Sequence, residues 1–232
     1  GRDGYSAISP GDFPSGGDFP ISLSGSVVSS PQPKKNIALG TMSHNTVFMS
    51  EQENAESTNS QPQSNKLLIL VRHAKSSWEN LGLNDFDRPL NPRGLRDAPE
   101  MGKRLAAKYA PPDHFASSPA ARAWATAEII ANAWNFPSDK LLPLPAAYEA
   151  SASTLLGIVG EFPPDATSAA LAAHNPSITI LVNFLAGMEI ANVPTCGVAV
   201  IRFSVKNWQE IEEGAGELVE YDFPKNHPAD RP

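Results

Sequence analysis

Two short stretches of the chain end an apolar run in a histidine. "LLILVRH" ends in Arg72 and His73, and "LAAHNP" carries His174. A third stretch, "FASSPAAR", ends an apolar run at Ser117 and brings Arg122 close to the start of a predicted helix. In open α/β sheets, ligands bind outside the carboxyl ends of the strands. We therefore expect two histidines and two arginines at one edge of a sheet.

These residue types favour an anionic ligand. The planar guanidinium fork suits the oxygens of phosphate, and helix N-termini add free N–H groups and partial positive charge. Ser118 with Pro119, and Asn175 with Pro176, predict two helices that begin at this edge with a side-chain cap followed by proline. A single histidine or arginine in such a place is more often an ordinary surface residue. Four of them at equivalent junctions favour a phosphate-binding site.

The rest of the pattern predicts the elements that position these residues. Short apolar runs alternate with stretches whose apolar residues recur at helical spacing, which predicts an α/β fold with helices on the faces of a sheet. The predicted strands are residues 66–71, 113–118, 140–145, 167–174, 197–203 and 217–223. The predicted helices are residues 91–109, 118–134, 151–162 and 175–188. The stretch 167–174 also fits the start of a buried helix.

The composition changes sharply at Lys66. Residues 1–65 are rich in Ser, Gly, Pro and Asn and lack a sustained period, so they predict a disordered, low-complexity N-terminal tail. Residues 66–225 predict a single folded domain, and residues 226–232 a short C-terminal tail. Met42 and Met49 both precede start-like sequence, so it stays open whether residues 1–48 belong to the native protein.

Charge, the length of apolar runs and cysteine content bear on the protein's partners and on its compartment. The 18 basic and 25 acidic side chains give a net charge of −7, which argues against a nucleic-acid partner. No apolar run approaches the roughly 20 residues of a membrane helix, and no secretory leader is visible. The single cysteine, Cys196, cannot form an internal disulfide. We therefore expect a cytoplasmic protein without a membrane anchor, and a monomer, although the oligomeric state stays open.

Five motifs together resemble the histidine phosphatase superfamily, the phosphoglycerate mutase-like group. They are "RHAKSSW", "FDRPLNPRG", "SSPAARAWATAEII", "HNP" and "PTCGVAVIRF". They are most similar to the small SixA-type phosphohistidine phosphatase branch, over nearly all of residues 66–205. The resemblance implies a three-layer α/β/α sandwich with a mostly parallel central sheet. It also makes the folded domain a catalytic domain, that of a hydrolase.

The resemblance implies a role for each candidate residue. His73 would be the nucleophile and take the phosphoryl group as a covalent phosphohistidine. Arg72 and Arg122 would bind the phosphoryl oxygens, and His174 would donate to the same group. Arg88, in "DFDRPL", matches a loop arginine that closes over the phosphate. Arginines would supply the positive charge that phosphoryl transfer needs, so neither a metal nor a cofactor is expected.

Three further residues are weaker candidates. Lys75 and Asn175 could contact substrate, although Lys75 could equally be solvated. Many superfamily members use a carboxylic acid to protonate an alcohol leaving group, and the matching region "LPAAYEASAS" offers only Glu149. Glu149 is a possible general acid, but a solvated residue fits the sequence better.

The lack of a clear general acid favours phosphohistidine in a protein as the substrate. Imidazole leaves phosphorus more readily than an alkoxide does, so it needs less help from an acid. A small phosphate ester is the alternative substrate. A non-catalytic module that binds phosphate is a third, less favoured reading.

A rival motif starts at the single cysteine. Cys196 to Arg202, "CGVAVIR", spells the Cys-x5-Arg pattern of cysteine-based phosphatases. That chemistry needs a tight loop around the phosphate. The β-branched alternation of this stretch instead predicts a strand, which would hold the two side chains roughly 20 Å apart. We therefore expect no catalytic role for Cys196.

Overall fold

The computed structural model describes residues 65–226. Nearly all of the predicted N-terminal tail and of the predicted C-terminal tail lies outside these residues. Six strands form one sheet in the order β3-β2-β4-β1-β5-β6. Their bounds are β1 Lys66–Arg72, β2 His114–Ser117, β3 Leu141–Pro143, β4 Ser168–Ala173, β5 Val198–Phe203 and β6 Glu217–Asp222. The first four strands are mutually parallel, and β5 runs antiparallel to both β1 and β6. The expected mostly parallel sheet is therefore confirmed.

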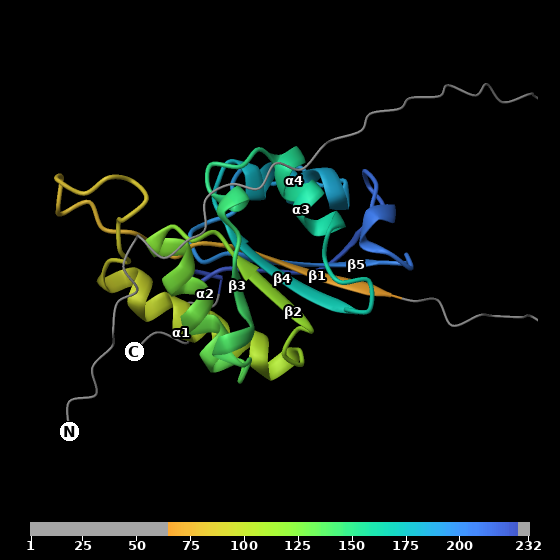
Figure 1. The fold of residues 1–232 in the computed structure, drawn as a ribbon, viewed down its shortest axis with the longest axis horizontal. Coiled ribbons are helices and arrows are strands. Elements are labelled where there is room, and N and C mark those ends of the chain that lie inside the picture. Colours follow the sequence, from red (N-terminus) through yellow and green to blue (C-terminus); the bar gives the residue numbers. More distant parts are fainter. Residues whose placement is uncertain (1–64, 227–232) are drawn as a thin grey trace, which may run out of the picture. The chain divides into compact units, whose positions relative to one another are not determined.

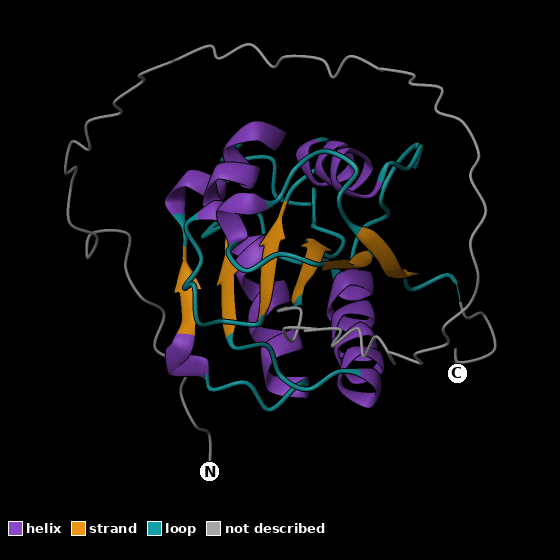
Figure 2. Cartoon of the chain, turned by 90° about the vertical axis from the view of Figure 1, so that its right-hand side faces the viewer, coloured by secondary structure: helices purple, strands orange, loops and turns teal. Residues whose placement is uncertain are grey.

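Helices cover both faces of this sheet. The four α-helices are α1 Pro92–Lys108, α2 Ala121–Ala133, α3 Ala152–Gly160 and α4 Ser177–Ala186. Short 3-10 turns occupy Ser138–Lys140, Pro145–Ala147 and Trp208–Glu210. Figure 1 shows α1 and α2 on one side of the strands and α3 and α4 on the other. Figure 2 shows the same layers, with helices above and below the strands. The expected α/β/α sandwich is confirmed, and no helix within residues 65–226 is long and apolar enough to cross a bilayer.

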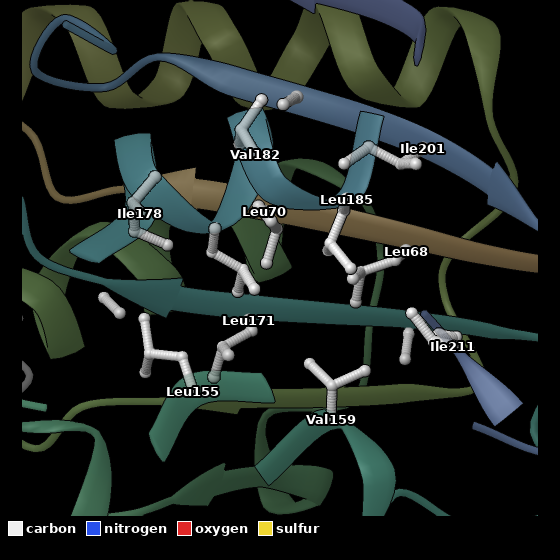
Figure 3. Close-up of a cluster of buried hydrophobic side chains, with 14 of the residues drawn as sticks. Leu68, Leu70, Leu155, Val159, Leu171, Ile178, Val182, Leu185, Ile201 and Ile211 are labelled. Carbon is white, nitrogen blue, oxygen red and sulfur yellow. The ribbon is translucent and has the colours of Figure 1, made fainter. Parts of the chain in front are cut away.

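The central strand β1 explains why both faces need covering. Its residues alternate between two buried apolar clusters, with Leu68 and Leu70 in one and Ile69 and Val71 in the other. Strands of a parallel sheet that are buried on both faces read as continuous apolar runs, which accounts for "LLILV". The α3 and α4 side of this core is shown in Figure 3, where helix side chains meet those of β1, β4 and β5.

Two helix starts differ from the sequence prediction. We expected Ser118 and Asn175 to cap helices, with proline in the first helical position. Helix α2 instead begins at Ala121, and α4 at Ser177, and neither has a side-chain cap. The Ser118 side chain bonds to His174 and to the N–H of Ala120, before α2 begins, and that of Asn175 bonds to Asn192 and to the Thr179 hydroxyl. Neither side chain caps a helix, so those two predictions are wrong. The other end of α4 lies within two residues of the predicted end at residue 188: the helix ends at Ala186, and Gly187 closes it in the left-handed conformation, at φ 60°.

Leu171 tests how much the covered sheet depends on its core. Its side chain is fully buried in β4, between β1 and the helices of one face. Leu171→Ala should lower the free energy of unfolding by about 2–5 kcal/mol, because it removes apolar contacts and leaves a cavity. Leu95→Ala, at a residue that is 55% exposed on α1, is the matched control and should change it by less than about 0.5 kcal/mol. Urea denaturation of the full chain measures both, and equal losses would contradict this account of the core.

Candidate active site

The register of three adjacent strands brings their carboxyl ends into line. Arg72 at the end of β1 lies opposite Ala173 of β4, and Ser117 at the end of β2 lies opposite Ala172. Just past these ends, the backbone N–H of His73 donates to the carbonyl oxygen of Ala173 at 3.1 Å. The next residues of the three strands, His73, Ser118 and His174, therefore lie at one edge of the sheet.

His73 is held in one orientation by a backbone carbonyl. The imidazole is 9% exposed, and its Nδ1 lies 2.7 Å from the carbonyl oxygen of Ala74. A carbonyl can only accept, so Nδ1 carries the proton and Nε2 keeps a free lone pair. Burial, and then the charges of His174, Arg122 and Arg72, lower the pKa of His73 to about 3, against the opposing effect of the Ala74 bond. His73 is therefore neutral at physiological pH.

His174 faces His73 across the site. The ring centroids lie 5.1 Å apart, and Nε2 of His174 lies 2.8 Å from the hydroxyl oxygen of Ser118. Burial and the charge of Arg122 lower the pKa of His174 to about 4. Its Nδ1 is buried and has no hydrogen-bond partner within the described chain. If the Ser118 hydroxyl donates to Nε2, the His174 proton resides on Nδ1, where it is available to a ligand.

Arg72 is anchored by the loop between α4 and β5. Its Nη1 donates to the carbonyl oxygen of Val193 at 2.6 Å and to Oδ1 of Asn192 at 3.3 Å. Asn175 Nδ2 donates to the same two oxygens, at 3.1 and 2.9 Å. Among residues 65–226, Nε of Arg72 is buried without a hydrogen-bond partner. Buried polar groups are nearly always paired, so this N–H, like Nδ1 of His174, marks a place for ligand oxygens.

Two further arginines meet at the carboxylate of Asp85. Nη2 of Arg122 lies 2.7 Å from Oδ2, and Nη1 of Arg88 lies 2.8 Å from Oδ1. Arg88 also donates to the hydroxyl oxygen of Ser76 at 2.6 Å and to the carbonyl oxygen of Ser77 at 3.1 Å. Both arginine side chains are largely buried. Because Arg122 lowers the pKa of both histidines, it belongs to the same site. Arg88 is connected to Arg122 through the carboxylate of Asp85.

The weaker candidates lie in different settings. The side chain of Asn175 holds Asn192 and Val193 beside Arg72, as described above. The side chains of Lys75 and Glu149 make no hydrogen bond or ion pair within residues 65–226. Glu149 is exposed, and its backbone has a positive φ of 51°. An open groove of about 420 Å³ begins at Asn175 and Asn192 and follows α4, so it borders the Arg72 end of the site. The roles of all the candidate residues stay predictions.

Three groups at the site were missed by the sequence reasoning. Asp85 and Tyr148 come from loops far apart in the chain, and the Tyr148 ring packs edge-on against His174 at 5.8 Å. Asn192 also lies in a loop. Only Asp85 carried any signal, because it precedes Arg88 by three residues in "DFDRPL".

The rival cysteine motif does not form a phosphate loop. The stretch after Cys196 is strand β5, as predicted, and Arg202 pairs with Glu217 at 3.0 Å. The Cys196 thiol is fully buried, which raises its pKa far above the usual value. Its backbone N–H donates to the carbonyl oxygen of His73, so its visible role is to brace the chain behind that histidine. Residues 65–226 contain no group of three or more His, Cys, Asp or Glu side chains that could hold a metal ion.

Comparisons with known proteins agree with this geometry. The model of the histidine phosphatase superfamily (branch 1) matches residues 68–144. An uncharacterized protein of Mycobacterium tuberculosis is 30% identical over 165 residues, which span 67% of this chain and all of the relative. A SixA-type chain from Agrobacterium tumefaciens has a similar fold, with a TM-score of 0.58 at 26% identity over 68% of this chain and 97% of that one. The protein histidine phosphatase SixA complexed with tungstate shares the fold, with a TM-score of 0.56 at 21% identity over 69% and 98% of the two chains.

The two lowered pKa values can be tested by titration. His73 and His174 should stay neutral as the pH falls from 7 to 5, whereas an ordinary histidine with a pKa of about 6.5 becomes mostly protonated. Because the unfolded chain takes up these protons and the folded chain does not, the free energy of unfolding should fall as the pH drops below about 6.5. NMR titration of the imidazole protons, assigned with His73→Gln and His174→Gln, measures both groups. A titration midpoint near pH 6.5 for either histidine would contradict the burial of that ring beside the arginines.

Proposed function

Because this chain belongs to the histidine phosphatase superfamily, we propose that it hydrolyses phosphohistidine in a protein through a covalent intermediate on His73. The observation that carries the proposal is the neutral His73 ring, 5.1 Å from His174 and subject to the charges of Arg72 and Arg122. A free Nε2 lone pair beside fixed positive charge suits attack on a phosphoryl group.

The first step transfers the phosphoryl group to the enzyme. The lone pair of His73 Nε2 attacks phosphorus while the bond from phosphorus to the substrate nitrogen breaks, and the leaving imidazole keeps that electron pair. Arg72, through its unpaired Nε–H, and Arg122 hold the phosphoryl oxygens, and His174 donates from Nδ1. Such prearranged donors stabilise the charge that spreads over these oxygens in the transition state.

The second step returns the enzyme to its starting state. Water attacks phosphorus, the bond to Nε2 breaks, and the electron pair returns to His73 as phosphate leaves and a proton passes to solvent. The Nδ1 hydrogen bond to Ala74 keeps Nε2 directed towards phosphorus throughout. Because burial and then the arginines disfavour a cation on His73, the free imidazole is ready for the next substrate.

The acidic groups near the site favour phosphohistidine over an alkyl phosphate. Although partial burial opposes ionisation of Asp85, its bonds to Arg122, Arg88 and Tyr148 hold its pKa below the usual value. An ionised carboxylate is a poor proton donor to an alkoxide. In phosphohistidine the leaving imidazole can already carry a proton on its other nitrogen, so it needs less help. The likeness to the SixA chain from A. tumefaciens, for which this activity has been suggested, supports the same substrate.

His73→Ala should lower turnover of a phosphohistidine peptide by roughly a thousandfold or more, because it removes the nucleophile. His114→Gln is the matched control, since His114 begins β2 at the other edge of the sheet and should keep near-normal turnover. Cys196→Ser should also stay active. A labelled enzyme intermediate that is labile in acid and stable in alkali should form with wild type and not with His73→Ala. Undiminished turnover by His73→Ala would rule out the proposed nucleophile.

The choice of substrate is tested by direct comparison. We expect kcat/KM for a phosphohistidine peptide to exceed that for an alkyl phosphate by at least about tenfold, because the site lacks a good acid for an alkoxide. Steady-state assays of the full chain with both substrates measure the ratio. Faster cleavage of the ester would favour the small phosphate ester instead. Binding of either substrate without any turnover would favour a non-catalytic module.

A further inference from the structure

Asp85 lies between Arg122, which the proposed function assigns to the phosphoryl oxygens, and Arg88, which the family resemblance assigns to a loop that closes over the phosphate. One carboxylate oxygen accepts from Arg122 at 2.7 Å and the other from Arg88 at 2.8 Å. The backbone carbonyl of Asp85 accepts a further bond from Nη1 of Arg122 at 2.5 Å. The hydroxyl of Tyr148 donates to the same carboxylate at 3.2 Å. A single loop residue therefore binds three side chains from three separate segments.

We propose that Asp85 is a positioning residue that aligns Arg122 and Arg88 with the phosphoryl group of the substrate; this inference rests on the proposed function. Both arginine residues are only 7% exposed, so the mutual repulsion of their charges is poorly screened by water. The carboxylate between them offsets that repulsion and fixes the direction of each fork. Without it, the two cations would move apart or turn towards solvent.

Asp85 leaves Arg122 free to bind a second anion. A guanidinium has five N–H donors, and Asp85 engages one on each terminal nitrogen of Arg122. The remaining donors stay available to phosphoryl oxygens. Taken with Arg72, the three arginines and one carboxylate keep a formal surplus of two positive charges, which matches a doubly charged phosphoryl group. The loop therefore adjusts the charge of the site as well as its shape.

The loop that carries Asp85 is docked onto the start of α2. The backbone N–H of Ala121 donates to the carbonyl oxygen of Phe86 at 2.9 Å, and the Phe86 ring meets Tyr148 edge-on at 5.1 Å. Tyr148 in turn packs against His174. Because this docking begins one residue before Arg122, a shift of Asp85 would be transmitted directly to the arginine. An error of about 1 Å in such a group costs roughly a hundredfold in rate.

The experiment compares Asp85→Ala and Asp85→Asn with Asp87→Ala in the full chain. Asp87 is the matched control, because its carboxylate lies in the same loop and bonds to Asn84 instead of an arginine. Turnover of a phosphohistidine peptide, inhibition by tungstate and the thermal midpoint are measured for each. Both Asp85 variants should lose roughly a hundredfold in kcat/KM and at least about tenfold in tungstate affinity. Asp87→Ala should stay within about twofold of wild type for both, as expected away from such features.

A double-mutant cycle separates positioning from a purely structural role. In an Arg122→Lys background, which lacks the two-pronged fork, Asp85→Asn should have little further effect on tungstate binding, because the two residues act as a unit. Additive losses would overturn the inference, as would normal tungstate affinity in a variant with a lowered thermal midpoint. Tighter tungstate binding by Asp85→Ala would also overturn it, since the carboxylate would then compete with phosphate. If wild type neither turns over the peptide nor binds tungstate, the proposed function itself fails.

Discussion

The rest of this structure depends on the interaction of two uncharged imidazoles with the guanidinium groups near them. These groups meet at the carboxyl ends of the parallel strands. Burial and then the charges of the arginines lower the pKa of both His73 and His174, and the nearby His174 also lowers that of His73. A neutral imidazole beside cations is a nucleophile that protons do not block. The same cations attract the anion on which it would act.

The sheet provides the rigidity that this arrangement requires. Arg72 and Ser117 end strands that both pair with β4, so the groups that follow them are separated by the fixed spacing between strands. Helices bury both faces of β1, so the strand that carries Arg72 has little freedom to shift. A site built on strand ends is held more closely than one built on loops alone, which suits a reaction governed by the placement of oxygens around phosphorus.

Loops complete what the strands begin. Asp85, Tyr148 and Asn192 lie in segments outside the strands, and each contacts a residue assigned to substrate or a neighbour of one. Nε of Arg72 and Nδ1 of His174 stay buried without a hydrogen-bond partner in the described chain, which is unusual for buried polar groups.

The sequence by itself determined the layers of this protein and the residues at its strand ends. Apolar runs that stop at Arg72, Ser117 and Ala173 predicted buried strands that deliver the next residues to one edge, although the last run also fitted a helix start, and the motifs around them identified the superfamily. The details of helix capping were decided by tertiary contacts, because the Ser118 side chain bonds to His174 and that of Asn175 to Asn192, and neither caps the helix that follows it. Only the folded chain could bring Asp85 to Arg122, 37 residues away, since loop contacts follow no local period.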